Sequence, residues 1–414
     1  MKHKKETQDS YWKVLVLILC FGWVAIWIYR TVLTPIYPEI QAAFGGISDT
    51  EIGLISTFYF SAYCGGQIPA SLCVERKGQK FTLLVGFSLF SFGTLVIANA
   101  NSMVLVYGGS LFSGLGCASF FCSAYSLSGQ NVPEKRRALA SAVVNSGCAL
   151  GMGIGLIGSS VLVRNMGMPW YDVLYVSAAI IIIMAIVFAL MIKNGKTTKH
   201  EPRQAITPNE NANKEKKSLF SSQLIAAYFV YFCTCYGYYM IVTWLPSFLQ
   251  SERGFEGAAI GGASALVAVA AVPGAIFFSS FVDKYRHQAV RTVILLEIAA
   301  AIMLTCAVIA PNTWALMLCL VIYGFLGKMA LDPILIAFVT ERVPTARLAR
   351  ALAIFNLSGM SSSIIAPPIT GFISDVTGSK AIGFYLSSGL LIIGAITFTF
   401  ICLRRYSHLE RQQA

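Results

Sequence analysis

Residues 71–80 read SLCVERKGQK, and residues 279–288, which lie 208 positions further along, read SSFVDKYRHQ. Each segment begins with a small residue and has a Val, an acid and a base in its middle. The acids and bases are Glu75, Arg76, Asp283 and Lys284. Because this charged pattern follows a long apolar run in both places, it suggests that one structural unit occurs twice.

Further matches support the repeat, because they follow in the same order in both halves. They are Ile52-Gly53 with Ile260-Gly261, Val132-Pro133 with Val343-Pro344, residues 137–140 with residues 350–353 (both RALA), and Asn145 with Asn356. Parallel repeats of this kind build a large class of membrane transporters, whose substrate sites lie between the repeats near the middle of the bilayer. We therefore expect two related halves.

Composition places most of the chain in a membrane. Of its 414 residues, 56% are hydrophobic and only 12% are charged, whereas soluble domains have roughly 25% charged residues. A helix crosses the bilayer core with about 20 apolar residues, and such runs predict about twelve transmembrane helices. They lie near residues 13–36, 50–73, 80–99, 103–130, 138–163, 171–192, 221–249, 258–281, 290–309, 314–339, 350–373 and 381–403.

The net charge of +12 is carried by loops. Lys and Arg gather in alternate loops, while the connections between them carry few charges. This positive-inside pattern predicts an inner-membrane protein with both termini in the cytoplasm, and it argues against nucleic-acid binding. The apolar run after Lys2, Lys4 and Lys5 is long enough to cross the bilayer, so we expect it to be retained as the first helix rather than removed as a signal peptide.

A polar segment at residues 193–219 interrupts the apolar pattern near the midpoint of the chain. It contains Pro and many charges and has no hydrophobic periodicity, which is typical of a flexible linker. We therefore expect an all-α membrane protein with an N-terminal six-helix bundle at residues 1–192, a cytoplasmic linker at 193–219 and a C-terminal six-helix bundle at 220–414.

These features resemble the major facilitator superfamily over essentially the whole chain. In that family the loop between helices 2 and 3 runs Gly, three residues, Asp, Arg, one residue, Gly and two basic residues. The corresponding residues here are Ser71, Glu75, Arg76, Gly78, Gln79 and Lys80. The resemblance implies the family's twelve-helix fold. A carboxylate at this helix end can pair with nearby bases, so we expect Glu75 and Arg76, with Asp283 and Lys284, to form a conformational latch. The alternative is a plain positive-inside loop.

The ends of the first and seventh helices are similar to those of the organic anion–cation symporters, a group of this superfamily that carries sugar acids and related carboxylates. Residues 29–40 read YRTVLTPIYPEI, and residues 243–249 read TWLPSFL. In that group an Arg at the position of Arg30 contacts the substrate. The group usually has an acid before this Arg and a base in the fourth helix, where this chain has Tyr29 and Ser110. Parts of the usual proton-coupling apparatus are therefore missing or moved.

Four charged residues stand out inside the predicted spans, where a charge at the bilayer centre costs roughly 2.5–3.5 kcal/mol and is a candidate for function. Arg30 is expected to bind an anionic group, or alternatively to reach the outer interface. Lys328 is expected to be a second cationic contact, or alternatively to pair with Asp332 in a helix kinked by Pro333. Asp332 is also the candidate for cation coupling, because a buried acid can change its protonation state. Glu297 is expected to pair with an Arg in a loop.

Uncharged residues complete the candidate substrate site. They are Trp27, Tyr59, Tyr63, Gln67, Asn145 and Asn356. Tyr59, Tyr63 and Gln67 recur at four-residue steps and so share one face of a helix. The two Asn residues occupy matching places in helices 5 and 11, and the resemblance implies that both are polar ligands. For each aromatic residue the alternative is packing or a place at the membrane interface.

The sequence thus predicts a secondary active transporter that moves a small organic anion, a carboxylate or sugar acid, with a coupling cation that is a proton or sodium. The alternative is an exporter or antiporter of a drug or metabolite. Gly147, Gly151 and Gly155 suit close helix packing, but the Gly-Pro pair of many drug antiporters is absent. The eleven cysteines lack metal-ligand spacing, and no catalytic or nucleotide-binding motif occurs. We expect no enzyme activity, no cofactor and no metal, and a monomer whose partners are the anion, the cation and the lipid bilayer.

Overall fold

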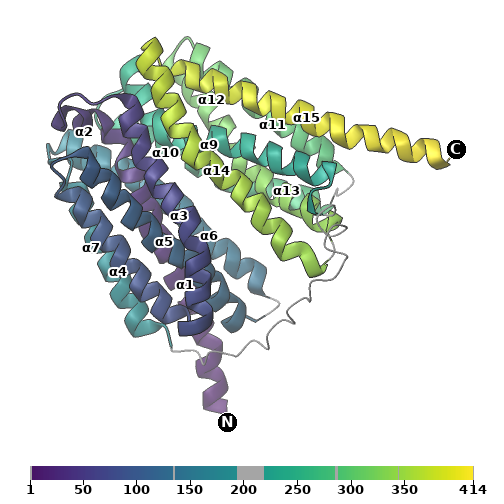
Figure 1. Ribbon diagram of the computed structural model, residues 1–414, viewed down its shortest axis with the longest axis horizontal. Coiled ribbons are helices and arrows are strands. Elements are labelled where there is room, and N and C mark those ends of the chain that lie inside the picture. Colours follow the sequence, from purple (N-terminus) through teal and green to yellow (C-terminus); the bar gives the residue numbers. More distant parts are fainter. Residues whose placement is uncertain (1, 134–135, 194–218, 285–287, 344, 414) are drawn as a thin grey trace. The chain divides into compact units, whose positions relative to one another are not determined.

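The described parts of the chain fold into α-helices (Figure 1). The computed structural model describes residues 2–133, 136–193, 219–284, 288–343 and 345–413. Most of the predicted linker at 193–219 lies outside these residues, as do the side chains of Asp283 and Lys284. Within the described ranges every regular element is helical, so the predicted all-α fold class is confirmed.

The elements before residue 200 form one set. They are α1 (Lys2–Val32), η1 (Thr34–Ile36), α2 (Tyr37–Ala43), α3 (Asp49–Lys77), α4 (Gln79–Ala98), α5 (Met103–Asn131), α6 (Arg137–Ser159), the π-helical segment η3 (Ser160–Asn165) and α7 (Asp172–Met191). Helix α1 packs against α6 and α7, while α3 and α4 both pack against α5. The short helix α2 follows the first span and was not predicted.

The remaining elements form a second set. They are α9 (Ser222–Arg253), α10 (Ala258–Lys284), α11 (Ala289–Ile309), α12 (Thr313–Leu326), α13 (Lys328–Arg342), α14 (Thr345–Thr377) and α15 (Ala381–Gln413). Helix α9 packs against α13, α14 and α15, and α11 packs against α12 and α15. The chain divides into two compact units, one of Met1–His200 with Gly254–Ala265 and one of Glu201–Arg253 with Leu266–Ala414, so the first residues of α10 belong to the first unit.

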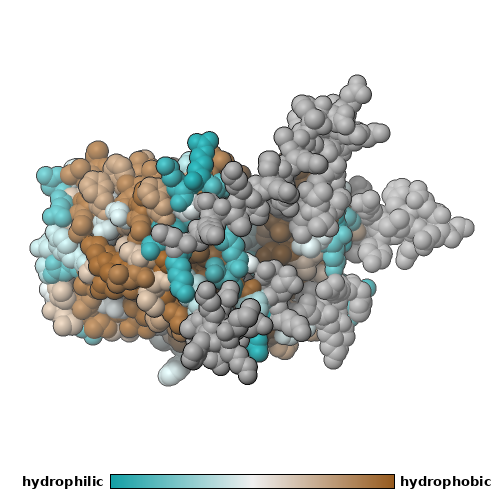
Figure 2. All heavy atoms as spheres, turned by 90° about the horizontal axis from the view of Figure 1, so that it is seen from below, coloured by the Kyte–Doolittle hydropathy of each residue, from teal (hydrophilic) through white to brown (hydrophobic). Residues whose placement is uncertain are grey.

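Eleven segments of the described chain are long and apolar enough to cross a membrane. Helix α3 is also long, with 29 residues, but it is not one of these eleven segments. It carries the polar residues Tyr59, Tyr63 and Gln67. Large apolar side chains are exposed on the helices of both units, as at Phe21, Leu190, Leu295, Trp314 and Phe372. Figure 2 shows broad hydrophobic areas on one face of the molecule. Exposed apolar surface on this scale is stable only against lipid, so the chain is a multi-pass membrane protein.

Local interactions define both ends of helix α3, which leads into the loop that carries the duplicated motif. Helix α3 begins with a capping box, in which the Ser48 hydroxyl accepts from the Glu51 N–H and the Glu51 carboxylate accepts from the Ser48 N–H. It ends at Lys77, and the next residue, Gly78, has a φ of 87°, which residues other than glycine rarely adopt. Helix α4 starts at the next residue, so this glycine makes the tight turn between the two spans.

A stripe of glycines brings α6 against the backbone of α1. A Cβ atom at Gly147 or Gly151 would overlap the carbonyl oxygen of Cys20 or Val24, and one at Gly155 would overlap Thr31 and the Ile28 carbonyl. The close packing predicted from the four-residue spacing of these glycines is therefore confirmed. It fixes α1, and with it Arg30, relative to α6.

Candidate substrate-binding site

Arg30, near the C-terminal end of α1, is surrounded by aromatic rings. Its guanidinium carbon lies 4.7 to 5.9 Å from the centroids of five rings, which are those of Trp23, Trp27, Tyr59, Phe60 and Tyr63. Cations within about 6 Å of a ring centroid are attracted to the ring face. We call these five residues the aromatic cage. Contacts of this kind stabilise a positive charge without neutralising it, so they are compatible with an anionic ligand.

Two polar contacts orient the Arg30 side chain within the cage. Its Nε atom donates to the Tyr59 hydroxyl at 3.0 Å, and its Nη2 atom donates to Cys117 Sγ at 3.7 Å. The rings of Tyr59 and Tyr63 are nearly parallel, at 6° and a centroid separation of 6.4 Å. Both rings project from α3, as expected for residues four positions apart on one helix face. The guanidinium is therefore held by α3 and α5 as well as by its own helix.

The sequence analysis identified some of the residues around Arg30 and missed others. Trp27, Tyr59 and Tyr63 were predicted to lie near Arg30, and they do. Trp23 and Phe60 were missed, as was Cys117. Trp23 lies four residues before Trp27, which places both on the face of α1 that carries Arg30, so this spacing was a usable signal. Cys117 carried no such signal, because its position depends on how α5 packs.

A small cavity of about 30 Å³ lies beside Arg30. Its lining consists of Tyr29, Arg30, Leu33, Tyr37, Ile55, Ser56, Tyr59 and Phe60. This volume holds a water molecule or two, because a cavity needs roughly 10–15 Å³ of this kind of space for each water. An organic acid bound at Arg30 would require this space to widen, through movement of α1 or α3.

In the second unit the tenth predicted span is interrupted. Helix α12 ends at Leu326, Gly327 has a non-helical ψ of −150°, and α13 begins at Lys328. The sequence placed a kink at Pro333 in a continuous helix, whereas the break occurs at Gly327. Glycine adopts non-helical conformations at little cost, which explains why the chain opens there. The break places Lys328 at the first turn of α13.

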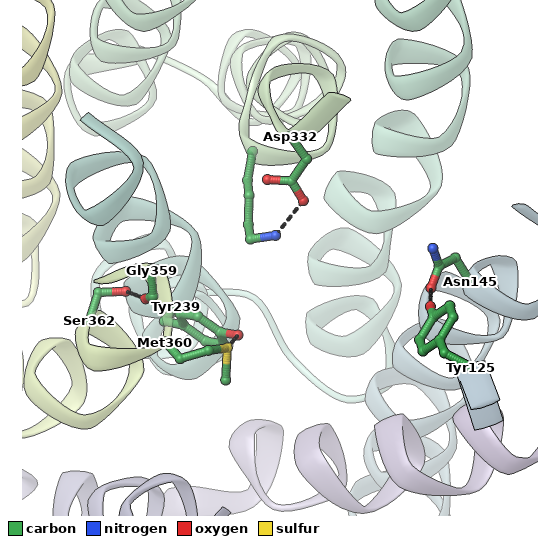
Figure 3. Close-up of polar contacts among 8 residues, drawn as sticks. Tyr125, Asn145, Tyr239, Asp332, Gly359, Met360 and Ser362 are labelled. Carbon is green, nitrogen blue, oxygen red and sulfur yellow. Dashed lines mark hydrogen bonds and ion pairs between the residues drawn. The ribbon is translucent and has the colours of Figure 1, made fainter. Parts of the chain in front are cut away.

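Lys328 is paired with an acid of its own helix. Its Nζ atom lies 2.6 Å from Asp332 Oδ2, and the side chains of Lys328 and Asp332 are 13% and 23% exposed. Figure 3 shows Asp332 with the dashed line that marks this contact. The Nζ atom also lies 5.6 and 5.5 Å from the ring centroids of Tyr231 and Tyr238 on α9. The predicted pairing of Lys328 with Asp332 is thus present, and two aromatic rings accompany it.

The remaining predicted ligands lie in different surroundings. Asn145 on α6 is exposed and accepts a hydrogen bond from the Tyr125 hydroxyl (Figure 3). Asn356 on α14 is half-buried and follows Phe355, whose ring stacks on Tyr231 at 3.9 Å between centroids. Gln67 is half-buried on α3, two turns beyond Tyr59, and is not one of the residues around Arg30. Gln67 and Asn145 belong to the first unit and Asn356 to the second, and their common role as substrate ligands stays a prediction.

The predicted latch is described in part. Glu75 and Arg76 are exposed at the C-terminal end of α3. The side chains of Asp283 and Lys284 lie outside the described residues, so the latch stays a prediction. Among the residues that the structure describes, no group of three His, Cys, Asp or Glu side chains has the arrangement of a metal site.

Glu297 differs from its prediction. It was expected to pair with an Arg in a loop, but its side chain is 0% exposed on α11 and is in hydrogen-bond contact with the Thr234 hydroxyl of α9. In the described part of the chain, none of the ion pairs includes Glu297. The expectation was wrong because α11 turns this residue towards α9 rather than towards the helix end.

Comparisons with known proteins agree with this architecture. Residues 19–303 and, in a second match, residues 263–414 match the Major Facilitator Superfamily. The chain is 24% identical to the cis,cis-muconate transport protein of Acinetobacter baylyi, over 89% of each chain. It is 23% identical to the D-galactonate transporter of Escherichia coli, over 94% of this chain and 95% of that one.

A solved structure has the same fold. A bacterial homologue of the human lysosomal transporter Spinster, in an inward-facing and occupied conformation, matches with a TM-score of 0.79 and 16% sequence identity. The match covers 95% of this chain and 97% of the other. The family match spans nearly the whole chain, and the relatives are transporters rather than enzymes. The resemblance noted in the sequence is therefore confirmed, and the chain belongs to the major facilitator superfamily.

Proposed function

We propose that this protein is a secondary active transporter that moves a small organic anion, a carboxylate or sugar acid, across the inner membrane by alternating access. The observation that carries the proposal is the Arg30 guanidinium within the aromatic cage. Arg matches a carboxylate with two parallel hydrogen bonds, and it keeps its charge under all physiological conditions. The names of the muconate and galactonate relatives support an anionic substrate.

Lys328 is the proposed second cationic contact, and Asp332 is the proposed coupling group. A substrate carboxylate that takes Lys328 from Asp332 leaves a mostly buried acid without its cation, and a buried unpaired carboxylate favours protonation. Substrate binding and proton binding would then support each other. The Lys328–Asp332 contact of 2.6 Å is the state before this exchange.

The remaining parts of the proposal follow from the loop charges and the repeat. Both termini lie in the cytoplasm, because Lys and Arg concentrate in the loops on that side. Two six-helix bundles, at residues 1–192 and 220–414, are joined by a cytoplasmic linker at 193–219. The protein acts as a monomer, with a proton or sodium as the coupling cation. Asn145, Asn356 and Gln67 contribute polar contacts to the substrate.

The test is uptake of labelled cis,cis-muconate, tartrate, D-galactonate and D-glucuronate into proteoliposomes, with and without an inward proton or sodium gradient. We expect at least one acid to accumulate in the wild type and not in Arg30→Gln. Lys13→Gln removes an exposed positive charge near the start of the same membrane-spanning segment, Tyr11–Ala43, and serves as the matched control. Uptake of none of these acids, with efflux of cationic drugs instead, would overturn the proposal in favour of an exporter.

Asp332→Asn tests the coupling role. We expect this variant to exchange substrate across the membrane but not to accumulate it in response to a proton gradient. Gradient-driven accumulation equal to that of the wild type would remove Asp332 from the coupling step and leave the anion site unaffected.

A further inference from the structure

Glu297 is a fully buried acid in the middle of an apolar helix, and the proposed function gives it no role. It is 0% exposed on α11, a helix that crosses the membrane. A carboxylate in such a place needs a cation or several hydrogen-bond donors, because a buried unpaired charge costs several kcal/mol. In the described residues the only hydrogen-bond partner of Glu297 is the Thr234 hydroxyl.

The count of protons at this contact indicates the state of the acid. Thr234 Oγ1 is in contact with Glu297 Oε1 and also lies 2.8 Å from the Val230 carbonyl oxygen. A hydroxyl has one proton to donate, so an ionised Glu297 and the Val230 carbonyl would compete for it. If Glu297 carries a proton, it donates to Thr234, and Thr234 donates to Val230. Both hydrogen bonds, from Glu297 to Thr234 and from Thr234 to the Val230 carbonyl, then have a proton to share.

The second carboxyl oxygen supports the same assignment. Glu297 Oε2 is buried and has no hydrogen-bond partner among the described residues. An unpartnered oxygen is less costly as the carbonyl of a neutral acid than as half of a carboxylate. In the described part of the chain, Cys233 and Cys235 on α9 and Tyr323 on α12 interact electrostatically with Glu297, and none of these is a cation at neutral pH. On α13, Lys328 is paired with Asp332.

Helix α9 connects this acid to the proposed anion site. Thr234 lies three residues after Tyr231 and four before Tyr238, the two residues whose rings contact Lys328. These spacings place all three side chains on neighbouring turns of one helix. A movement of α9 that changes the surroundings of Lys328 would therefore also change the contact between Thr234 and Glu297.

We propose that Glu297 is a proton-binding site of the transport cycle, which carries a proton in the conformation described here and exchanges it with water when α9 moves away from α11. This proposal rests on the proposed transport function for its second part only. Release of the proton breaks the O–H bond of the carboxyl group, leaves a carboxylate on Glu297 and gives the proton to water.

Infrared spectroscopy of the purified full-length protein tests the proton directly and does not depend on transport. We expect a carbonyl band of a protonated carboxyl group that disappears in Glu297→Gln and persists in Glu256→Gln, in which an exposed acid is changed. Thr234→Val keeps the acid but removes its hydrogen-bond partner, so the band should shift to higher frequency. Absence of the band in the wild type, or a band that Glu297→Gln leaves unchanged, would overturn the assignment.

Transport tests the link to the cycle. With the acid that the wild type accumulates, we expect Glu297→Gln to retain substrate exchange and to lose stimulation by an inward proton gradient. Wild-type stimulation in this variant would show that Glu297 is only a protonated contact between helices, and would overturn the second part. If no acid is transported by the wild type, the proposed function fails, while the infrared result still decides whether Glu297 holds a proton.

Discussion

Two cations inside membrane-spanning helices, Arg30 and Lys328, are stabilised by different chemistry. Arg30 in the first unit lies among five aromatic rings, whereas Lys328 in the second unit lies 2.6 Å from an acid of its own helix. Ring faces stabilise a cation without removing its charge, while an ion pair neutralises it. In the first unit the charge of Arg30 is thus retained, whereas in the second unit the charge of Lys328 is neutralised by Asp332.

This difference suggests that Arg30 binds the anion and that the Lys328–Asp332 pair couples binding to the cation. A site that holds an anion through the transport cycle needs a charge that is already stabilised, which the aromatic cage provides for Arg30. A site that couples binding to a proton needs two states, and in the proposed function the Lys328–Asp332 pair supplies them if Lys328 exchanges Asp332 for a substrate carboxylate. Each prediction below changes one side of this comparison.

The largest expected effect is on stability and concerns the ion pair. Lys328→Gln leaves Asp332 mostly buried without its cation, and removal of one partner of a buried pair costs roughly 3–5 kcal/mol. Because the two side chains are 13% and 23% exposed, we expect a value at the lower end. The double variant Lys328→Gln/Asp332→Asn should recover most of the loss. Thermal unfolding in detergent measures both, and equal losses in the single and double variants would contradict the pairing argument.

The next effect concerns the packing that positions Arg30. A Cβ atom at Gly151 would overlap the Val24 carbonyl and approach Trp27 Cβ to 2.8 Å, so Gly151→Ala must push α1 away from α6. Overpacking of this kind costs roughly 1–3 kcal/mol, and we expect a lower unfolding temperature together with weaker substrate binding. Gly153→Ala is the matched control, because a Cβ there has no neighbour within 4 Å. Equal behaviour of the two variants would mean that the glycine stripe does not position the cage.

The third effect separates charge from shape at Arg30. Lys in its place keeps the charge and the ring contacts but lacks the planar fork that binds a carboxylate with two hydrogen bonds. We expect the apparent substrate affinity of Arg30→Lys to fall at least tenfold, which corresponds to about 1.4 kcal/mol. Lys328→Arg, which keeps a cation beside Asp332, should change affinity less. The concentration dependence of uptake measures both, and an unchanged affinity in Arg30→Lys would assign Arg30 a structural role.

Properties that depend on long apolar runs were predictable from the sequence. The spans and the glycine packing follow from composition or spacing, and they agree with the helices and contacts of the structure. Arg30 and Lys328 were identifiable because a charge inside an apolar run is costly. Sequence spacing also found Trp27, Tyr59 and Tyr63, which share helix faces with one another or with Arg30.

Properties that depend on how helices rotate and approach one another were not predictable. The partner of Glu297 is Thr234, 63 residues away in the chain, and no local pattern links the two. The helix break occurs at Gly327, whereas Pro333 lies inside α13. Phe60 and Cys117 reach Arg30 only through the packing of α3 and α5.

The smallest expected effect tests whether the cage acts through its rings or through its one hydroxyl contact. Tyr59→Phe keeps the ring beside Arg30 but removes the oxygen that accepts from Nε at 3.0 Å. A hydrogen bond contributes about 1 kcal/mol net, so we expect roughly a fivefold loss of affinity. Tyr107→Phe, which removes a hydroxyl that donates to the Glu51 carbonyl on α3, is the matched control and should leave affinity unchanged. If affinity falls as much in Tyr59→Phe as in Arg30→Lys, the hydroxyl rather than the ring faces sets the orientation of the guanidinium. Arg30 would then depend on a polar contact, as Lys328 does, and the contrast between the two cations would be weaker than the distances suggest.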